Sequence, residues 1–280
     1  MFRLALGTVQ FGMQYGITNR TGVPDAAQLA QILDWALGQG IRDLDTASAY
    51  GNAQRRLGEF GVRDFRVVSK MPPHIEPDSM EPHLQDMLAQ LKCDRLFGLL
   101  LHAQEDLLDA QADARFAQLQ RLQTAGLINR IGISVYDGDA LIQIAQRFPI
   151  DMVQCPLNPL SRQCEAALQW LAENRPGLEI HLRSVFLQGA LLGDPESLPQ
   201  HLPDLRAGVA QFQAFCRAHK IHPGVAALSY LRRFTPETAV VGVSSLAELQ
   251  EIAAWHEAAA DVSVNIPDIP FSPQFDPRTW

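Results

Sequence analysis

The stretch Ile41-Arg-Asp-Leu-Asp-Thr-Ala-Ser-Ala-Tyr-Gly51 combines a short apolar run, a carboxylate at Asp45 and a tyrosine at Tyr50. The residues that follow, Asn-Ala-Gln-Arg-Arg-Leu-Gly, are typical of the start of a helix. We therefore expect Asp45 at the carboxyl end of a strand and Tyr50 in the loop above it. In a parallel barrel the loops at this end carry the chemistry.

Outward from this stretch, strand-like apolar runs alternate with helical periodicity along the whole chain. Helical spacing is clearest at Leu29, Ile32, Leu33 and Ala36, which follow a Pro-Asp helix start. The expected strands span residues 3–12, 41–45, 65–70, 96–101, 131–134, 152–156, 179–186 and 239–243. Eight strand–helix units predict an α/β fold, a (β/α)8 TIM barrel that forms a single domain over residues 1–280. The Pro-rich tail, 267–280, is expected on the surface or across the barrel mouth.

Composition and charge exclude several classes of partner. The formal net charge is −8 without a basic run, which argues against nucleic acid and anionic membranes. Apolar runs are far shorter than the ~20 residues that span a bilayer. The N-terminus lacks the pattern of a secretory signal, so we expect a cytoplasmic protein. The expected partner is a small-molecule substrate, and the sequence leaves the oligomeric state open.

Cysteine and histidine positions argue against a metal or a disulfide framework. Cys93, Cys155, Cys164 and Cys216 form no C-x-x-C pair. The eight histidines do not cluster with the spacing of metal ligands. We therefore expect no metal site.

Polar residues end three consecutive expected strands. Side chains alternate along a strand, so Asp45, Lys70 and His102 share the inward parity of their strands. Neighbouring strands lie ~4.8 Å apart, so the three side chains are expected to meet at the barrel mouth. The same parity points Asp43 inward one layer deeper, where a bulge or a buried arginine partner would account for it.

Together with Tyr50, the side chains of Asp45, Lys70 and His102 suit proton transfer to a carbonyl group. A tyrosine has a pKa of ~10, and a nearby ammonium lowers it. The carboxylate of Asp45 would keep Lys70 charged, and a neutral His102 would orient a carbonyl oxygen. The alternative for Asp45 and Lys70 is a structural ion pair. Taken singly, His102 could be a core histidine and Tyr50 a packed loop aromatic.

The chain resembles the aldo-keto reductases over nearly its whole length. The resemblance is carried by Leu6-Gly-Thr-Val-Gln-Phe-Gly12, Asp45-Thr-Ala-Ser-Ala-Tyr-Gly51, Ser69-Lys-Met71 and Leu101-His102. It implies an oxidoreductase that reduces an aldehyde or ketone to an alcohol, or the reverse. In this interpretation Tyr50 is the general acid and base, Lys70 and Asp45 tune it, and His102 positions the carbonyl.

The resemblance also implies NADP(H) or NAD(H), bound non-covalently over the barrel without a glycine-rich dinucleotide motif. Ser134 and Gln154 match residues that hold the carboxamide. The segment from Arg183 matches the loop that meets the pyrophosphate, and Val241-Gly-Val-Ser-Ser245 matches the segment that meets the adenosine phosphate. The expected cofactor-binding residues are Ser134, Gln154, Arg183, Ser184, Gln188, Gly189, Gly242, Ser244, Ser245 and Glu248.

Three departures from the family pattern bear on the cofactor. Val135 stands where many members have asparagine, and Arg183 where many have an aromatic ring under the nicotinamide. Glu248 and Ile252 replace residues that often grip the 2′-phosphate. No basic residue lies between positions 241 and 252, which predicts weak discrimination between NADPH and NADH.

Three alternatives compete with this interpretation. One is a barrel lyase or isomerase that forms a Schiff base on Lys70, which leaves Tyr50 and His102 unexplained. Another is a non-catalytic sensor of the nicotinamide cofactor on the same barrel, and a third is a structural barrel. The substrate is expected to contact the loops 104–111 and 188–203 and the tail. Few aromatic residues occur there, which favours a polar, sugar-like aldehyde.

Overall fold

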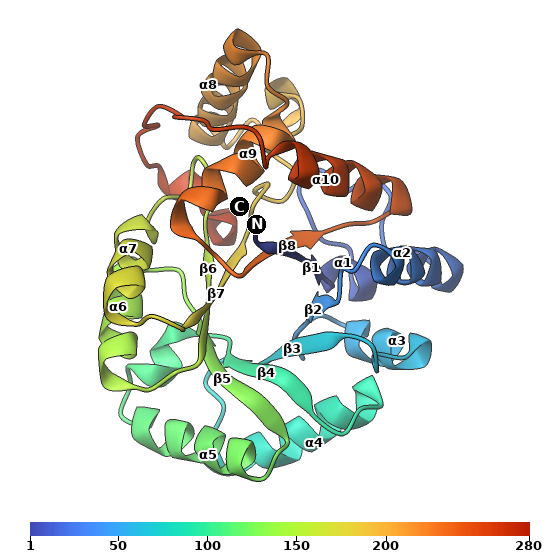
Figure 1. Ribbon diagram of the computed structural model, residues 1–280, viewed down its shortest axis with the longest axis vertical. Helices are drawn as coiled ribbons and strands as arrows, with labels where there is room; N and C mark the ends of the chain where they lie inside the picture. The colour runs from blue at the N-terminus through green and yellow to red at the C-terminus, as the bar shows by residue number, and fades with distance from the viewer.

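The computed structural model describes residues 1–280 and shows eight parallel strands in a closed barrel surrounded by helices (Figure 1). The strands follow one another around the barrel in chain order, and the first pairs with the last. This confirms the predicted (β/α)8 TIM barrel. The strands are β1 Arg3–Gly7, β2 Asp43–Asp45, β3 Arg66–Met71, β4 Leu96–Leu101, β5 Ile128–Ser134, β6 Met152–Pro156, β7 Glu179–Arg183 and β8 Thr238–Gly242.

The helices begin and end close to the capping residues in the sequence. Asp25 and Gln28 form a capping box at the start of the helix that follows β1. Ser245 is the N-cap of the last helix. The α-helices are α1 Val9–Gly12, α2 Ala26–Gly38, α3 Ala53–Phe60, α4 Met80–Leu91, α5 Ala112–Thr124, α6 Gly138–Arg147, α7 Glu165–Asn174, α8 Pro203–His219, α9 Pro223–Leu231 and α10 Leu246–Ala258.

Two strands end three or more residues earlier than the apolar pattern predicts. β1 ends at Gly7, and the apolar residues that follow form the short helix α1 with a buried Phe11. β7 ends at Arg183 because Ser184 has a φ of 58°, which no strand accommodates. The apolar residues beyond each strand are buried in loop and helix instead, so burial alone misled the prediction.

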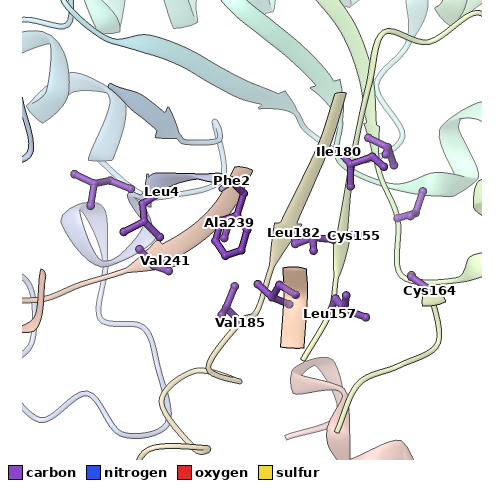
Figure 2. Packing of buried hydrophobic residues seen from close by; sticks show 14 of the residues in the cluster. Phe2, Leu4, Cys155, Leu157, Cys164, Ile180, Leu182, Val185, Ala239 and Val241 are labelled. Atoms are coloured by element: carbon purple, nitrogen blue, oxygen red, sulfur yellow. The ribbon is translucent and has the colours of Figure 1, made fainter. Parts of the chain in front are cut away.

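The main core lies between the outer face of the barrel and the helices. Figure 2 shows Cys155 of β6 beside Leu182 of β7, and these two residues are register partners. Leu4 and Ala239 pair in the same way across β1 and β8. All four side chains are buried in one large hydrophobic cluster. The strands are thus nearly continuous in apolar character, as expected where both faces of a sheet are covered.

The interior of the barrel below the mouth is filled by a separate, small apolar cluster of Val68, Leu100 and Met152. Each of these residues lies two positions before a polar residue of the mouth, so the alternation along each strand is regular. A Cβ atom on Gly98 or Gly132 would come within 2.5 or 2.4 Å of the Met152 side chain. Glycine at these two positions therefore lets Met152 form the floor of the site.

The opposite end of the barrel is closed by charged residues. Asp43 is buried and accepts hydrogen bonds from Arg3 Nε at 3.0 Å and Arg66 Nε at 2.6 Å. Glu179 bonds the same Arg3 at 3.1 Å. Asp43 thus points inward and has arginine partners, although their side chains are 47% and 35% exposed rather than buried as expected.

The last residues of the chain run back across the α8 end of the molecule (Figure 1). The Ser161 hydroxyl donates to the carbonyl of Phe275 at 2.9 Å, and Gln274 accepts from the backbone of Asp204 at 2.9 Å. These contacts bring Arg278 to the loop after β5, at the edge of the barrel mouth. None of the helices combines the length and apolar character needed to cross a membrane.

Candidate active site

Lys70 joins Asp45 to Tyr50 at the carboxyl end of the barrel. Its Nζ lies 2.7 Å from each carboxylate oxygen of Asp45 and 3.4 Å from the hydroxyl of Tyr50. The Thr46 carbonyl accepts a further hydrogen bond from the ammonium at 3.2 Å. The side chains of Lys70 and Asp45 are 1% and 5% exposed, so the ion pair is shielded from solvent. The structure therefore brings together Asp45 and Lys70, two of the three residues that strand parity predicted to meet, and adds the hydroxyl of the loop residue Tyr50.

His102 faces Tyr50 across the mouth. The two rings meet edge to face, with their centroids 6.2 Å apart. The Nδ1 atom of His102 is buried and has no hydrogen-bond partner in the chain. Burial, followed by the charges of Lys70 and Arg183, lowers the pKa of His102 to about 4. A neutral imidazole therefore faces the cavity near neutral pH, as the sequence analysis expected.

The direction of the Tyr50 pKa differs from the expectation that Lys70 would lower it. Burial raises the pKa of Tyr50 above its ordinary value, and the charge of Asp45 raises it further. The carboxylate of Asp45 offsets the ammonium beside the hydroxyl, because it lies 2.7 Å from that ammonium. Tyr50 is therefore held as a protonated hydroxyl near neutral pH.

Gln154 contacts Asp45 from the far side of the barrel. Its Nε2 donates to Asp45 Oδ1 at 2.7 Å, although the two residues are 109 positions apart. Its Oε1, like the Ser134 hydroxyl, is buried without a partner. Gln154 on β6 lines the cavity, whereas Ser134 at the end of β5 is buried and does not line it. The sequence predicted Gln154 at the carboxamide, and none of its patterns indicated the bond to Asp45.

Arg183, at the end of β7, lies over an aromatic ring. Its guanidinium carbon is 4.0 Å from the centroid of Tyr136, and Arg278 lies 3.5 Å from the same centroid. Arg183 also donates to the carbonyl of Val135 at 3.2 Å. Arg183 thus places a cation at the mouth, beside an aromatic ring.

The loop after β7 turns sharply beside the cavity. Ser184, Leu187 and Gln188 adopt positive φ values of 58°, 49° and 53°, and Gly189 follows at 87°. A Cβ on Gly189 would lie 2.0 Å from the Thr18 hydroxyl, so only glycine fits there. The loop positions predicted for pyrophosphate, namely Ser184, Gln188 and Gly189, all line the cavity.

At the junction between β8 and α10, the carboxylate of Glu248 folds back onto the backbone. Glu248 Oε2 accepts a hydrogen bond from the Ser244 backbone N–H at 2.7 Å, and the Ser245 hydroxyl caps the backbone of Glu248 at 3.2 Å. Gly242 leaves room for the side chain of Gln10, whose Nε2 would lie 2.2 Å from an added Cβ. The anion-binding end of α10 therefore already holds a negative charge.

The arginines just before β8 do not compensate for this charge. Arg232 donates to backbone carbonyls at the opposite end of α10, including that of Ala259 at 2.6 Å. Arg233 lies over the rings of Tyr230 and Phe234. Neither arginine lines the cavity.

A cavity of about 700 Å³ connects these features from the mouth to the start of α10. It is also lined by residues that the sequence analysis missed, above all the loop of residues 15–21. Tyr15 of this loop accepts a hydrogen bond from Gln188 at 3.0 Å, and Thr18 donates to the Gln188 carbonyl at 3.1 Å. The loop 104–111, expected near the substrate, does not line the cavity, and of 188–203 only the first residues do.

Aromatic residues at the cavity also went unnoticed in the sequence. The cavity is lined by Tyr15, Tyr136, Phe186 and Trp255, which lie outside the loops predicted to contact the substrate. Tyr136 lies two positions after Ser134, so an extended backbone would point both side chains to the same side. This spacing was the sequence signal for Tyr136. The structure has no group of three or more His, Cys, Asp or Glu side chains arranged to hold a metal ion.

Comparison with known proteins identifies the relatives of this chain. A family model described as the aldo/keto reductase family matches residues 3–262. A D-threo-aldose 1-dehydrogenase from Pseudomonas sp is 28% identical over 273 residues, which cover 80% of this chain and 82% of the relative. Aldo-keto reductase YhdN from Bacillus subtilis (strain 168) is 24% identical over 192 residues, which cover 62% of this chain and 55% of the relative.

Solved structures share the fold. Aldo-keto reductase AKR11C1 from Bacillus halodurans, solved in its holo form, superimposes with a TM-score of 0.76 and 18% identity. The match covers 98% of this chain and 95% of that one. At this identity the likeness concerns the fold alone.

Proposed function

Since the chain belongs to the aldo/keto reductase family and is an oxidoreductase of that fold, we propose that it moves hydride between NAD(P)(H) and a carbonyl or alcohol, with Tyr50 as general acid and base. The observation that carries the proposal is the chain of contacts from Asp45 through Lys70 to the Tyr50 hydroxyl, at 2.7 and 3.4 Å. A structural ion pair would not need a tyrosine hydroxyl at its open end. It would also not need an unpartnered imidazole beside that hydroxyl.

The bound nicotinamide supplies the hydride, and the chain's own residues manage the proton. In reduction, the Tyr50 hydroxyl donates to the carbonyl oxygen as that oxygen gains negative charge. The ammonium of Lys70 then stabilises the phenolate left on Tyr50, and Asp45 keeps that ammonium charged. Neutral His102 has a ring N–H with which to orient the carbonyl oxygen. In oxidation the same residues act in the opposite order.

The unpartnered buried atoms of the mouth fit the cofactor. A carboxamide has one acceptor and two donor hydrogens, and the chain offers it the free Gln154 Oε1 and the Ser134 hydroxyl. The backbone N–H groups of Val185, Phe186 and Gln188 have no partner within the chain, which suits a pyrophosphate beside that loop. Ser184 and Gly189 complete this part of the proposed site.

We propose weak discrimination between NADPH and NADH. Glu248 occupies the start of α10 and would repel a 2′-phosphate at the adenosine end. Gly242, Ser244 and Ser245 surround the same position and bring no positive charge.

For the substrate, a polar, sugar-like aldehyde or alcohol fits best. Polar residues outnumber hydrophobic ones around the cavity, and one relative is named as an aldose dehydrogenase. The same relative supports activity in the oxidative direction.

Replacement of Tyr50 by phenylalanine tests the function. We expect Tyr50→Phe to lower turnover of an aldehyde by about 10²–10⁴-fold and to leave cofactor affinity nearly unchanged. Steady-state kinetics with a panel of aldehydes and aldoses, together with fluorescence titration of both cofactors, would measure the two effects. Near-wild-type turnover in Tyr50→Phe would refute the assignment. Cofactor binding without turnover of any carbonyl or alcohol by the wild type would favour the sensor instead.

A further inference from the structure

Arg183 is a cation without a counter-ion beside the proposed proton donor. It forms no ion pair with any carboxylate of the chain, and it is half-buried in the wall of the cavity. Arg183 lines the same cavity as Tyr50 and His102. Its charge lowers the pKa of Tyr50, after the larger effects of burial and Asp45, and that of His102, after the larger effects of burial and Lys70. The other charges of the mouth, Asp45 and Lys70, neutralise each other at 2.7 Å.

The other carboxylates that line the cavity, Glu248 and Glu251, belong to α10, and neither forms an ion pair with Arg183. Glu248 accepts a hydrogen bond from the Ser244 backbone at the start of α10. Asp276 is close enough to feel the charge of Arg183, but Arg278 holds its two oxygens at 3.0 and 2.9 Å. The positive charge of Arg183 is therefore left for a ligand.

The guanidinium of Arg183 has hydrogen-bond donors to spare. Of its five N–H donors, one meets the Val135 carbonyl at 3.2 Å and a second meets the Ser184 hydroxyl at 3.5 Å. Its face lies over Tyr136, whose ring also contacts Arg278 at 3.5 Å. Stacking occupies the face of the guanidinium and leaves its edge for a planar anion.

We propose that Arg183 recognises a carboxylate on the substrate, so that the preferred substrate is a carbonyl compound that also carries an acid group. This proposal rests on the proposed function and names its substrate class. A planar carboxylate matches the fork of a guanidinium, and the half-buried setting strengthens the interaction. Arg183 is a specificity-determining residue in this account, and the proton is still handled by Tyr50.

The test compares 4-oxobutanoate with its methyl ester, which differ in charge and share the aldehyde. We expect the wild type to favour the acid in kcat/KM by about 10- to 100-fold, the range of a hydrogen bond to a charged group. Arg183→Met should abolish this preference, and Arg183→Lys should restore part of it. Arg278→Met is the matched control. Arg278 contacts the same ring of Tyr136, but its charge is already neutralised by Asp276. The preference for the acid over the ester should survive in this variant.

Two further measurements separate the possible outcomes. Succinate carries the acid groups without an aldehyde, and its calorimetric titration into the cofactor-loaded protein should weaken about 10- to 100-fold in Arg183→Met. If no carbonyl is turned over while succinate still binds through Arg183, the proposed function fails and the carboxylate site stands. An unchanged acid-to-ester ratio in Arg183→Met would overturn the proposal. The proposal would also be overturned if Arg183→Met bound NADH more weakly but kept the acid-to-ester ratio in kcat/KM, because Arg183 would then act on the nicotinamide.

Discussion

Removal of the Lys70 charge is the sharpest test of how the mouth is held together. In Lys70→Met the carboxylate of Asp45 stays in place, 5% exposed, and retains only the amide of Gln154 at 2.7 Å. Breaking a buried pair by removing one partner costs about 3–5 kcal/mol because an uncompensated charge remains inside. Methionine keeps most of the length of the lysine side chain, so little of this cost comes from a cavity. We expect Lys70→Met to lose about 3–5 kcal/mol in free energy of unfolding.

Urea denaturation followed by circular dichroism at pH 7.5 measures this loss, with the Asp45→Asn/Lys70→Met double variant as control. The double variant removes both charges and should regain most of the stability, since neutral replacement of a buried pair is often close to neutral. If Lys70→Met fails to fold while the double variant folds, the reasoning still holds. A loss below about 1 kcal/mol, or a double variant no more stable than the single one, would refute it.

The remaining predictions concern the cofactor, the pH profile and Gln154. Glu248→Arg should shift the cofactor preference toward NADPH, and Glu248→Gln is the control that keeps the contact with the Ser244 backbone. Titration of both cofactors measures the ratio of the two Kd values. An unchanged ratio would contradict the placement of the 2′-phosphate at Glu248. The pKa of His102 is lowered to about 4, so kcat/KM should show no step from this residue near pH 6.5. The free energy of unfolding that neutral His102 contributes should be fully present above pH 6.5 and should decline as the pH falls toward 4. His102→Gln should abolish this pH dependence in urea denaturation. Gln154→Met should weaken cofactor affinity and lower kcat together, whereas a role confined to the carboxamide would change affinity alone.

The fold could be predicted from the sequence because two periodicities repeat eight times. Alternation within strands placed Lys70 and Asp45 on one face, and a fixed strand spacing brought them to 2.7 Å. The ends of β1 and β7 could not be predicted as well, because buried apolar residues continue into the helix α1 and into the turn at Ser184. Apolar character reports burial and leaves the backbone conformation undetermined.

The parts of the site that escaped prediction depend on contacts between distant segments. The bond from Gln154 to Asp45 spans the interior of the closed barrel, and no local pattern reports it. The loop that carries Tyr15 lacks periodicity, so its place over the cavity depends on its bonds to Gln188. The pKa of Tyr50 is raised because burial and the charge of Asp45 outweigh the lowering effect of Arg183, and the residue order alone shows no burial.

The two charged clusters of the barrel differ in a way that bears on function. At the closed end, Asp43 is paired with Arg3 and Arg66, whose side chains are 47% and 35% exposed. That cluster can therefore keep its charges at low desolvation cost. At the mouth, Lys70 and Asp45 are both almost fully buried, where an apolar pair of similar size would often be as stable. Stability alone thus does not explain why the mouth carries the Lys70–Asp45 ion pair. The Tyr50 hydroxyl, 3.4 Å from the ammonium, supplies a chemical reason for it. A double variant at the mouth that folds well and has lost turnover would be the direct signature of a pair retained for catalysis.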